Sequence, residues 1–277
     1  MEVGVVVIQI EALTFIYAAG TPLAKTALEN LSFGVEDGEC VGIIGVNGSG
    51  KSTLVQHLNG LLRPTSGRVI VGGIDVGARG ADLATLRRQV GLVFQAPESQ
   101  LFAPILFEDV AFGPRQIGLP ASSITRVVEE ALRQVGLPVS EFGQRSPFSL
   151  SGGQMRRAAL AGVLAMEPRV LVLDEPTAGL DGEGRADLYN VLCRLQSERQ
   201  TTILLVSHDM SEVAALAERI LVLHQGQLVM QGSPRELSNR RIGWQNGGWR
   251  RPRLARWLCC CVGRACPSRR MRCHWMS

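Results

Sequence analysis

The sequence lacks the features of a membrane-spanning or secreted protein. Hydrophobic residues make up 45% of its 277 residues, yet no uninterrupted apolar run approaches the ~18 residues that a membrane-spanning helix needs. The apolar stretch 3–16 carries Gln9 and Glu11 and starts acidic rather than basic, which argues against a secretory signal. No internal repeat or long heptad tract is present. We therefore expect one folded unit with a single large α/β core.

A glycine-rich loop lies between a predicted strand and a predicted helix. Residues 40–44 form an apolar run typical of a buried parallel strand, and residues 52–61 repeat leucine and valine at helical spacing. Glycines let successive backbone N–H groups and the helix N-terminus point at a triphosphate. Lys51 would reach the β- and γ-phosphates, and the Ser52 hydroxyl would ligate Mg²⁺. The predicted phosphate-binding residues are Gly45, Asn47, Gly48, Ser49, Gly50, Lys51, Ser52 and Thr53.

A second apolar run, residues 170–173, ends in two carboxylates. Such a run is buried on both faces of a parallel sheet, and ligands bind outside the carboxyl ends of its strands. We expect Asp174 to hold Mg²⁺ through water and Glu175 to act as the general base that polarises the attacking water. Alone, the two acids could simply cap a strand before Pro176. Beside a phosphate loop, the catalytic interpretation is favoured.

Residues 150–154 supply a third motif, which opens a predicted helix with Ser151 as a natural N-cap. With all three motifs, residues 5–238 resemble the ATP-binding cassette (ABC) ATPases. The resemblance implies an α/β P-loop fold with a RecA-like parallel-sheet core, antiparallel N-terminal strands and a helical subdomain inserted at about residues 96–165. It also implies that Ser151, Gly152, Gly153 and Gln154 contact the γ-phosphate held by a partner subunit, so that two cassettes face each other head to tail.

The resemblance assigns roles to four more residues. Gln95 matches the loop that senses Mg²⁺ and water and links to a membrane partner, and Asp181 matches the loop that crosses the dimer interface. His208 matches the switch histidine that touches the γ-phosphate. Tyr17 is the candidate ring that stacks on adenine. The alternatives are that Phe15 supplies the ring or that Tyr17 is a buried strand residue.

The sequence around the motifs is similar to that of one subfamily. Residues 56–62, 93–102 and 109–114 resemble the ATPases of energy-coupling factor transporters, which import vitamins and cobalt or nickel ions into bacteria. Residues 146–148 and 154–168 resemble the second, A-prime type of its two ATPase subunits. The implied cofactors are ATP and Mg²⁺. The implied partners are a second ABC ATPase, a transmembrane coupling (T) protein and substrate-binding membrane (S) proteins, with no nucleic acid. The implied location is peripheral, on the cytoplasmic face of the cell membrane.

Three alternative functions are compatible with some of the same motifs. An ATPase of another importer would carry the same catalytic motifs and differ only in its partner. A soluble, non-transport ABC ATPase typically has two cassettes or an inserted coiled coil, and this chain has neither. A nonhydrolytic subunit is disfavoured because Lys51, Glu175 and His208 are all present.

Residues 239–277 do not resemble the family. Acidic residues and lysine are absent after Glu236, while all four tryptophans and five of the seven cysteines fall in this tail. The abrupt change favours a shifted reading frame beginning near Asn239. Two functional alternatives are a lipid-modified anchor at the adjacent cysteines 259–261 and a metal site at Cys266, Cys273 and His274, although no Cys-x-x-Cys pair is present. Cys40 and Cys193, in apolar or helical contexts, are expected to be ordinary reduced thiols.

Overall fold

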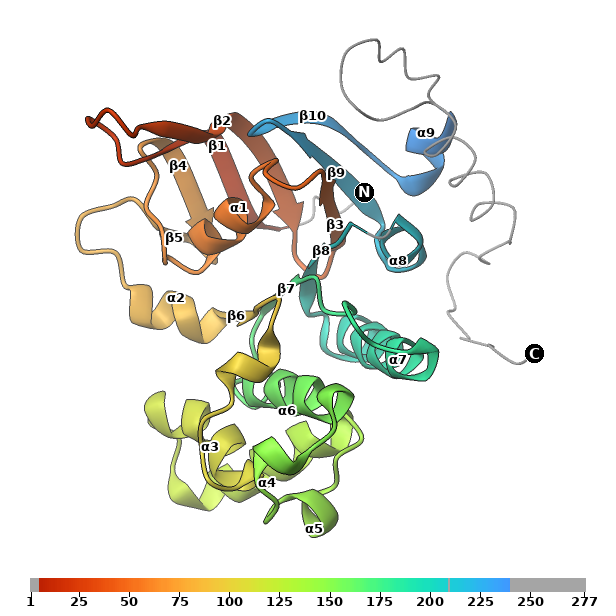
Figure 1. The fold of residues 1–277 in the computed structure, drawn as a ribbon. Helices are drawn as coiled ribbons and strands as arrows, with labels where there is room; N and C mark the ends of the chain where they lie inside the picture. The colour runs from red at the N-terminus through yellow and green to blue at the C-terminus, as the bar shows by residue number, and fades with distance from the viewer. Residues whose placement is uncertain (1–4, 209, 240–277) are drawn as a thin grey trace.

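The computed structural model describes residues 5–208 and 210–239, which build two sheets and a layer of helices (Figure 1). The first sheet is antiparallel and has the strand order β2-β1-β4-β5. Its strands are β1 (Val6–Tyr17), β2 (Lys25–Glu36), β4 (Ser66–Val71) and β5 (Ile74–Asp75). The reading-frame, lipid-anchor and metal-site hypotheses about the tail concern residues after Asn239, which lie outside the described part of the chain.

The second sheet positions two of the three motifs, the glycine-rich loop and the pair of carboxylates. Within the described residues it has the strand order β10-β9-β3-β8-β7-β6, and its neighbours are parallel except for the antiparallel pair β9 and β10. Its strands are β3 (Cys40–Gly45), β6 (Val90–Val93), β7 (Val170–Asp174), β8 (Thr202–Val206), β9 (Arg219–His224) and β10 (Gln227–Gly232). Since the strands β3, β6, β7 and β8 run in one direction, the loops that follow them meet at one edge of the sheet.

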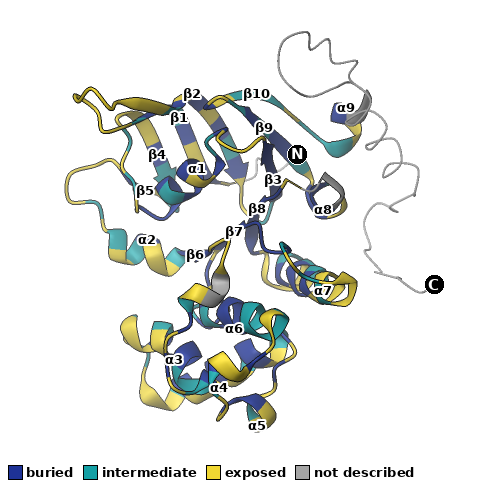
Figure 2. Ribbon diagram, in the orientation of Figure 1, coloured by how far each residue is buried: buried dark blue, intermediate teal, exposed yellow. Residues whose placement is uncertain are grey.

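The parallel sheet separates two hydrophobic cores. Along β7, Val170 and Val172 face a core shared with β1, β2, β4 and the helix after the glycine-rich loop. Leu171 and Leu173 face the opposite core, which is filled by helices. Figure 2 shows β3, β7 and β8 as buried along their length. Burial on both faces explains why these strands are continuous apolar runs rather than alternating ones.

The helices flank the parallel sheet. They are α1 (Lys51–Leu58), α2 (Leu83–Gln89), α3 (Leu106–Gln116), α4 (Ala121–Gln134), α5 (Val139–Phe142), α6 (Gly152–Leu164), α7 (Gly182–Arg199), α8 (Met210–Leu216) and α9 (Pro234–Asn239), with 3₁₀ turns at Pro97–Gln100 and Pro147–Ser149. Helices α3 to α6 pack against one another in a separate layer, seen below β6 and β7 in Figure 1. They fall inside the segment 96–165, where the sequence predicts the inserted subdomain. None of the helices in the described residues is both long and apolar enough to cross a membrane.

Helix ends agree with the glycine signals, although one helix ends earlier than its leucine spacing predicts. The apolar stripe predicted near residues 123–135 is buried, and Gly136, at φ 70°, follows the last turn of α4. Helix α1 ends at Leu58 instead of near Leu61, because Asn59 caps it and Gly60 adopts φ 70°. Leu61 is exposed as a result. Strand β6 ends at Val93, so an exposed Phe94 separates it from Gln95.

Candidate active site

The glycine-rich loop joins the carboxyl end of β3 to α1. Gly48 and Gly50 have φ angles of 79° and 103°, in the left-handed region that favours glycine. A Cβ atom on Gly50 would lie 2.7 Å from the carbonyl oxygen of Ala27. The loop therefore packs directly against the backbone of β2, and a side chain at Gly50 would push it away.

Lys51, one of two lysines in the chain, is buried where this loop meets α1. Its Nζ donates to the carbonyl oxygens of Gly45 at 2.9 Å and Val46 at 3.2 Å. Burial lowers the pKa of Lys51, and the nearby carboxylates of Glu175 and Asp174 offset part of that effect. The ammonium group of Lys51 is thus held at a loop whose backbone N–H groups can bind phosphate oxygens.

Ser52 and Asp174 form the group best suited to Mg²⁺. Ser52 Oγ donates to Asp174 Oδ2 at 3.0 Å, joining the first turn of α1 to the end of β7. Burial raises the pKa of Asp174, and the hydrogen bond from Ser52 lowers it in part. No cluster of three or more His, Cys, Asp or Glu residues suited to a metal occurs in the described part of the chain. A hydroxyl and one carboxylate nevertheless fit Mg²⁺, which is commonly held by one or two protein oxygens together with substrate phosphates and water.

Glu175 and His208 meet at the carboxyl ends of β7 and β8. These strands are neighbours, with Asp174 opposite Val206, and the Glu175 N–H donates to Val206 O at 2.8 Å. Glu175 is buried and has a φ of 54°, an uncommon conformation for a residue with a side chain. Its Oε2 contacts His208 Nδ1, while the His208 side chain is 69% exposed. A buried carboxylate is thus held by an imidazole that remains open to a ligand.

The signature residues begin α6. Ser151 Oγ accepts from Gln154 N at 3.3 Å, and Gln154 Oε1 accepts from Ser151 N at 3.0 Å, which completes a capping box. The predicted N-cap is confirmed. Ser151 and Gly152 are exposed, Gly153 is partly buried, and α6 lies in the helical layer away from α1 (Figure 1). The fold does not bring the signature to the phosphate loop of the same chain.

The two aromatic candidates differ in accessibility. Tyr17, at the end of β1, is 41% exposed, and its hydroxyl lies 3.1 Å from Thr53 Oγ1 on α1. Phe15 is 9% exposed and packs edge-to-face against Tyr17 with ring centroids 4.8 Å apart. The ring of Tyr17 lies beside α1 and is exposed, so an adenine base can reach it, whereas the ring of Phe15 is covered.

Gln95 and Asp181 lie on exposed loops. Gln95 follows β6 at the same sheet edge as Asp174. Asp181 caps α7, since its Oδ1 accepts from Gly184 N at 2.8 Å. This capping role was not expected from the sequence, and it fixes the end of the loop that follows Glu175.

Three polar residues near the site were missed by the sequence analysis. Glu212, on α8, is 1% exposed and accepts hydrogen bonds from Thr177 and Ser207. A signal was available, because an acid shares this short helix with the buried apolar residues Val213 and Leu216. Its partners come from two loops, which periodicity within one helix cannot reveal.

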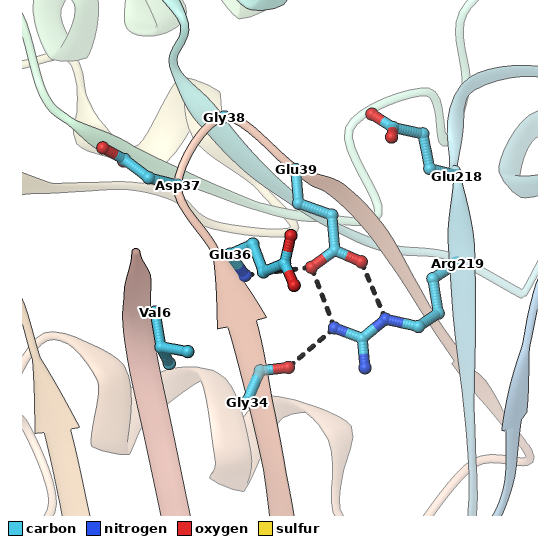
Figure 3. A pocket seen from close by; sticks show the side chains of 8 residues that line it. All are labelled: Val6, Gly34, Glu36, Asp37, Gly38, Glu39, Glu218 and Arg219. Atoms are coloured by element: carbon cyan, nitrogen blue, oxygen red, sulfur yellow. Dashed lines mark hydrogen bonds and ion pairs between the residues drawn. The ribbon is translucent and has the colours of Figure 1, made fainter. Parts of the chain in front are cut away.

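A separate hollow of about 410 Å³ lies at the opposite end of the parallel sheet (Figure 3). Arg219, at the start of β9, donates to Glu39 from Nε at 2.7 Å and from Nη2 at 2.8 Å. The same Nη2 donates to the carbonyl oxygen of Gly34 in β2 at 2.6 Å. No predicted site residue lines this hollow, and the hydrogen bond from Arg219 to Gly34 joins the two sheets.

Comparison with known proteins shows the family to which the chain belongs. Residues 28–178 match the sequence model of the ABC transporter family, so the chain belongs to that family. Within it, the chain is 56% identical over 231 residues to the energy-coupling factor transporter ATP-binding protein EcfA2 of Symbiobacterium thermophilum, covering 83% of this chain and 80% of that protein. It is 49% identical to the protein of the same name from Clostridium acetobutylicum, covering 84% and 81%.

Solved structures show the same fold. The structure of cbiO1 from Clostridium perfringens, described as part of the ABC transporter complex cbiONQ, is 38% identical with a TM-score of 0.74, covering 83% of this chain and 90% of that chain. A dimeric structure of the ATP-binding cassette MJ0796 bound to ADP and Pi is 28% identical with a TM-score of 0.74, covering 82% and 98%. The predicted family and fold class are confirmed.

Proposed function

We propose that this chain is the ATP-binding and ATP-hydrolysing subunit, of the A-prime type, of an energy-coupling factor importer. The observation that carries the catalytic part is the convergence of Lys51, the Ser52–Asp174 bond and the Glu175–His208 contact where β3, β7 and β8 end. The relatives named EcfA2 support the transporter part, because they are 46–56% identical over most of the chain.

The chemistry follows from the position of each side chain. Lys51 and the loop amides bind the β- and γ-phosphates, and the ring of Tyr17 stacks on adenine. Ser52 and Asp174, with Gln95 nearby, would hold Mg²⁺, which neutralises charge on the phosphates when bound. Glu175 accepts the proton of the attacking water. His208 fixes the Glu175 carboxylate and steadies the transferred phosphoryl group.

The site needs a second cassette to be complete. The exposed N-terminus of α6, capped by Ser151, is a backbone-amide site suited to an anion, and it lies away from the phosphate loop of its own chain. Ser151 through Gln154 therefore close over the γ-phosphate of a partner ABC ATPase, and Asp181 lies on the loop between the two. The partner is either a second copy of this chain or a different ABC ATPase.

The remaining partners are membrane proteins. The Gln95 loop and helices α3 to α6 would transmit closure of the two cassettes to a transmembrane coupling (T) protein, which serves substrate-binding (S) proteins. The chain would then be peripheral, on the cytoplasmic face of the cell membrane. The relative cbiO1 is itself described as part of a transporter complex, which supports a multisubunit assembly.

Replacing the base tests the catalytic assignment. Glu175→Gln removes the proton acceptor but keeps the shape of the site, so ATP hydrolysis should fall at least about 100-fold while ATP binding persists. With ATP and Mg²⁺, light scattering should show a trapped pair of cassettes, and phosphate release should measure the loss of turnover. Glu129→Gln, on the exposed face of α4, is the matched control. Normal turnover in Glu175→Gln would remove Glu175 as the base.

A further inference from the structure

One buried carboxyl group joins the two loops that carry Glu175 and His208. Glu212 Oε2 accepts from Thr177 Oγ1 at 3.0 Å and also from Ser207 Oγ. Thr177 lies two residues after Glu175, and Ser207 directly precedes His208. Both hydroxyls donate to the same oxygen atom, so the Glu212 carboxyl group links the two loops.

Packing alone does not explain an acid at this position. Glu212 and Ser207 are each 1% exposed and Thr177 is 7% exposed, and α8 already buries Val213 and Leu216 against the sheet. A carboxyl group is costly to bury unless it is hydrogen-bonded, and an apolar side chain of similar volume would fill the space without that cost. The carboxyl group of Glu212 instead fixes the positions of Thr177 and Ser207, because hydrogen bonds hold their partners at a defined angle and distance.

The two loops that Glu212 links carry Glu175 and His208, whose relative position matters for the proposed hydrolysis. Glu175 has a φ of 54° and contacts His208 from the neighbouring strand. Thr177 also begins the segment that ends at Asp181, the cap of α7. A shift of Thr177 therefore changes the Glu175 backbone, and through Glu212 it changes Ser207 and the adjacent His208.

We propose that Glu212 is a positioning residue for ATP hydrolysis, which sets Glu175 and His208 relative to each other through Thr177 and Ser207 without touching the nucleotide. The inference rests on the proposed roles of Glu175 and His208. It extends them, because the same bonds tie the 177–181 loop to the His208 loop, so that a displacement of either loop is transmitted to the other.

The decisive variants replace the carboxyl group of Glu212 while keeping the length of the side chain. Glu212→Met removes both hydrogen bonds, so kcat for ATP hydrolysis should fall about 10- to 100-fold, as expected when catalytic groups are misplaced by a fraction of an ångström to one ångström. KM for ATP should change less than about twofold, because Lys51, Ser52 and Tyr17 are untouched. Glu212→Gln, whose amide oxygen can accept from both hydroxyls, should restore most of kcat.

Two further variants keep the test decisive if Glu212→Met does not fold. Thr177→Val and Ser207→Ala each remove one hydroxyl from the cluster and leave Glu212 in place. Each should lower kcat by less than Glu212→Met does, and adding either to Glu212→Met should cost little more, because the bonds are already lost. Thr125→Val, on the exposed face of α4, is the matched control for loss of a hydroxyl.

The assays use the full chain in its transporter complex, with activity normalised to bound nucleotide. A lowered kcat at unchanged KM, with rescue by Glu212→Gln, supports the positioning role. Unchanged kcat in Thr177→Val and Ser207→Ala overturns it, as does a rise in KM alone. Glu175→Gln is measured in parallel: if it also hydrolyses ATP normally, the proposed function fails and the positioning role fails with it. If only Glu175→Gln is inactive, the positioning role alone is wrong.

Discussion

At the scale of single residues, the site concentrates charge where water is scarce. Lys51, Asp174 and Glu175 are all buried, and the attraction of Lys51 to the two carboxylates offsets only part of the cost of burial. The cation at Lys51 and the oxygens of Ser52 and Asp174 instead match the charges of a nucleotide and its metal ion. In the proposed function these groups serve the binding of the nucleotide and its metal ion rather than the stability of the fold.

Asp37 shows the opposite, stabilising use of a charge. It lies in the turn between β2 and β3, and Arg169, just before β7, donates to it at 3.0 and 2.6 Å. The Arg169 guanidinium holds the pKa of Asp37 below its usual 3.8, and a weaker bond from Thr202 acts in the same direction. The folded chain therefore binds this proton less tightly than the unfolded chain does.

A pH series on Asp37→Asn tests this contribution. Because the folded pKa is lowered, Asp37 stabilises the fold at pH above 3.8, and this stabilisation is lost as pH falls through the lowered value. The variant should be less stable than the wild type at pH 7, and the difference should shrink as pH drops below about 4. Urea unfolding at each pH measures it, with Glu198→Gln on the exposed face of α7 as control. A difference that stays constant with pH would contradict the assignment.

At the scale of secondary-structure elements, α6 combines a structural and a functional N-terminus. Its capping box satisfies backbone donors that would otherwise lack partners. The same exposed turn is the part that meets a phosphate of the partner in the proposed function. Substitutions at Ser151 can separate the two roles, because capping and anion binding respond oppositely to negative charge.

Two substitutions at Ser151 make this separation. Ser151→Ala should lower the free energy of unfolding by about 1 kcal/mol, because alanine cannot cap. Ser151→Asp should keep it within about 0.5 kcal/mol, because aspartate caps as well as serine. Both should lower ATP hydrolysis, and Ser151→Asp more, since its carboxylate would repel the γ-phosphate. Urea unfolding and phosphate release provide the two readouts.

A cap remote from the site serves as control. Asp82 caps α2 by accepting from Thr85 N at 3.0 Å. Asp82→Ala should lower stability by a similar amount to Ser151→Ala while leaving hydrolysis unchanged. If Ser151→Asp hydrolyses ATP at the wild-type rate, the N-terminus of α6 does not face a phosphate.

Local signals explain which elements could be predicted. The apolar runs of β3, β7 and β8 predict buried strands because both of their faces are covered, and Gly136 predicts the end of α4 because it takes the left-handed conformation. The helical spacing of Leu61 predicts an α1 that is three residues too long, because Leu61 lies after Gly60, where the helix has already ended. Glu212 was missed because its partners lie on loops about 30 residues apart in the chain, which only the parallel sheet brings together.

At the scale of the whole molecule, the proposed function requires an assembly with other proteins. We expect the chain, extracted from its native membranes in mild detergent, to copurify with a second ABC ATPase, a coupling membrane protein and small substrate-binding membrane proteins. Mass spectrometry would identify them, and an intact mass would establish how the chain ends after Asn239. Recovery of the chain alone or with ribosomes would contradict the proposed partners.

The order of the strands also constrains how the chain is made. β3 hydrogen-bonds to β8 on one side and to β9 on the other, both of which are encoded far downstream, whereas β1 and β2 can pair as soon as they emerge from the ribosome. The nascent chain must therefore carry the apolar strand β3 without its neighbours until residues 202–223 have been synthesised. During that interval β3 is a candidate for chaperone binding or for aggregation. If the chain left the ribosome before β8 was synthesised, the glycine-rich loop would be attached to an unpaired strand.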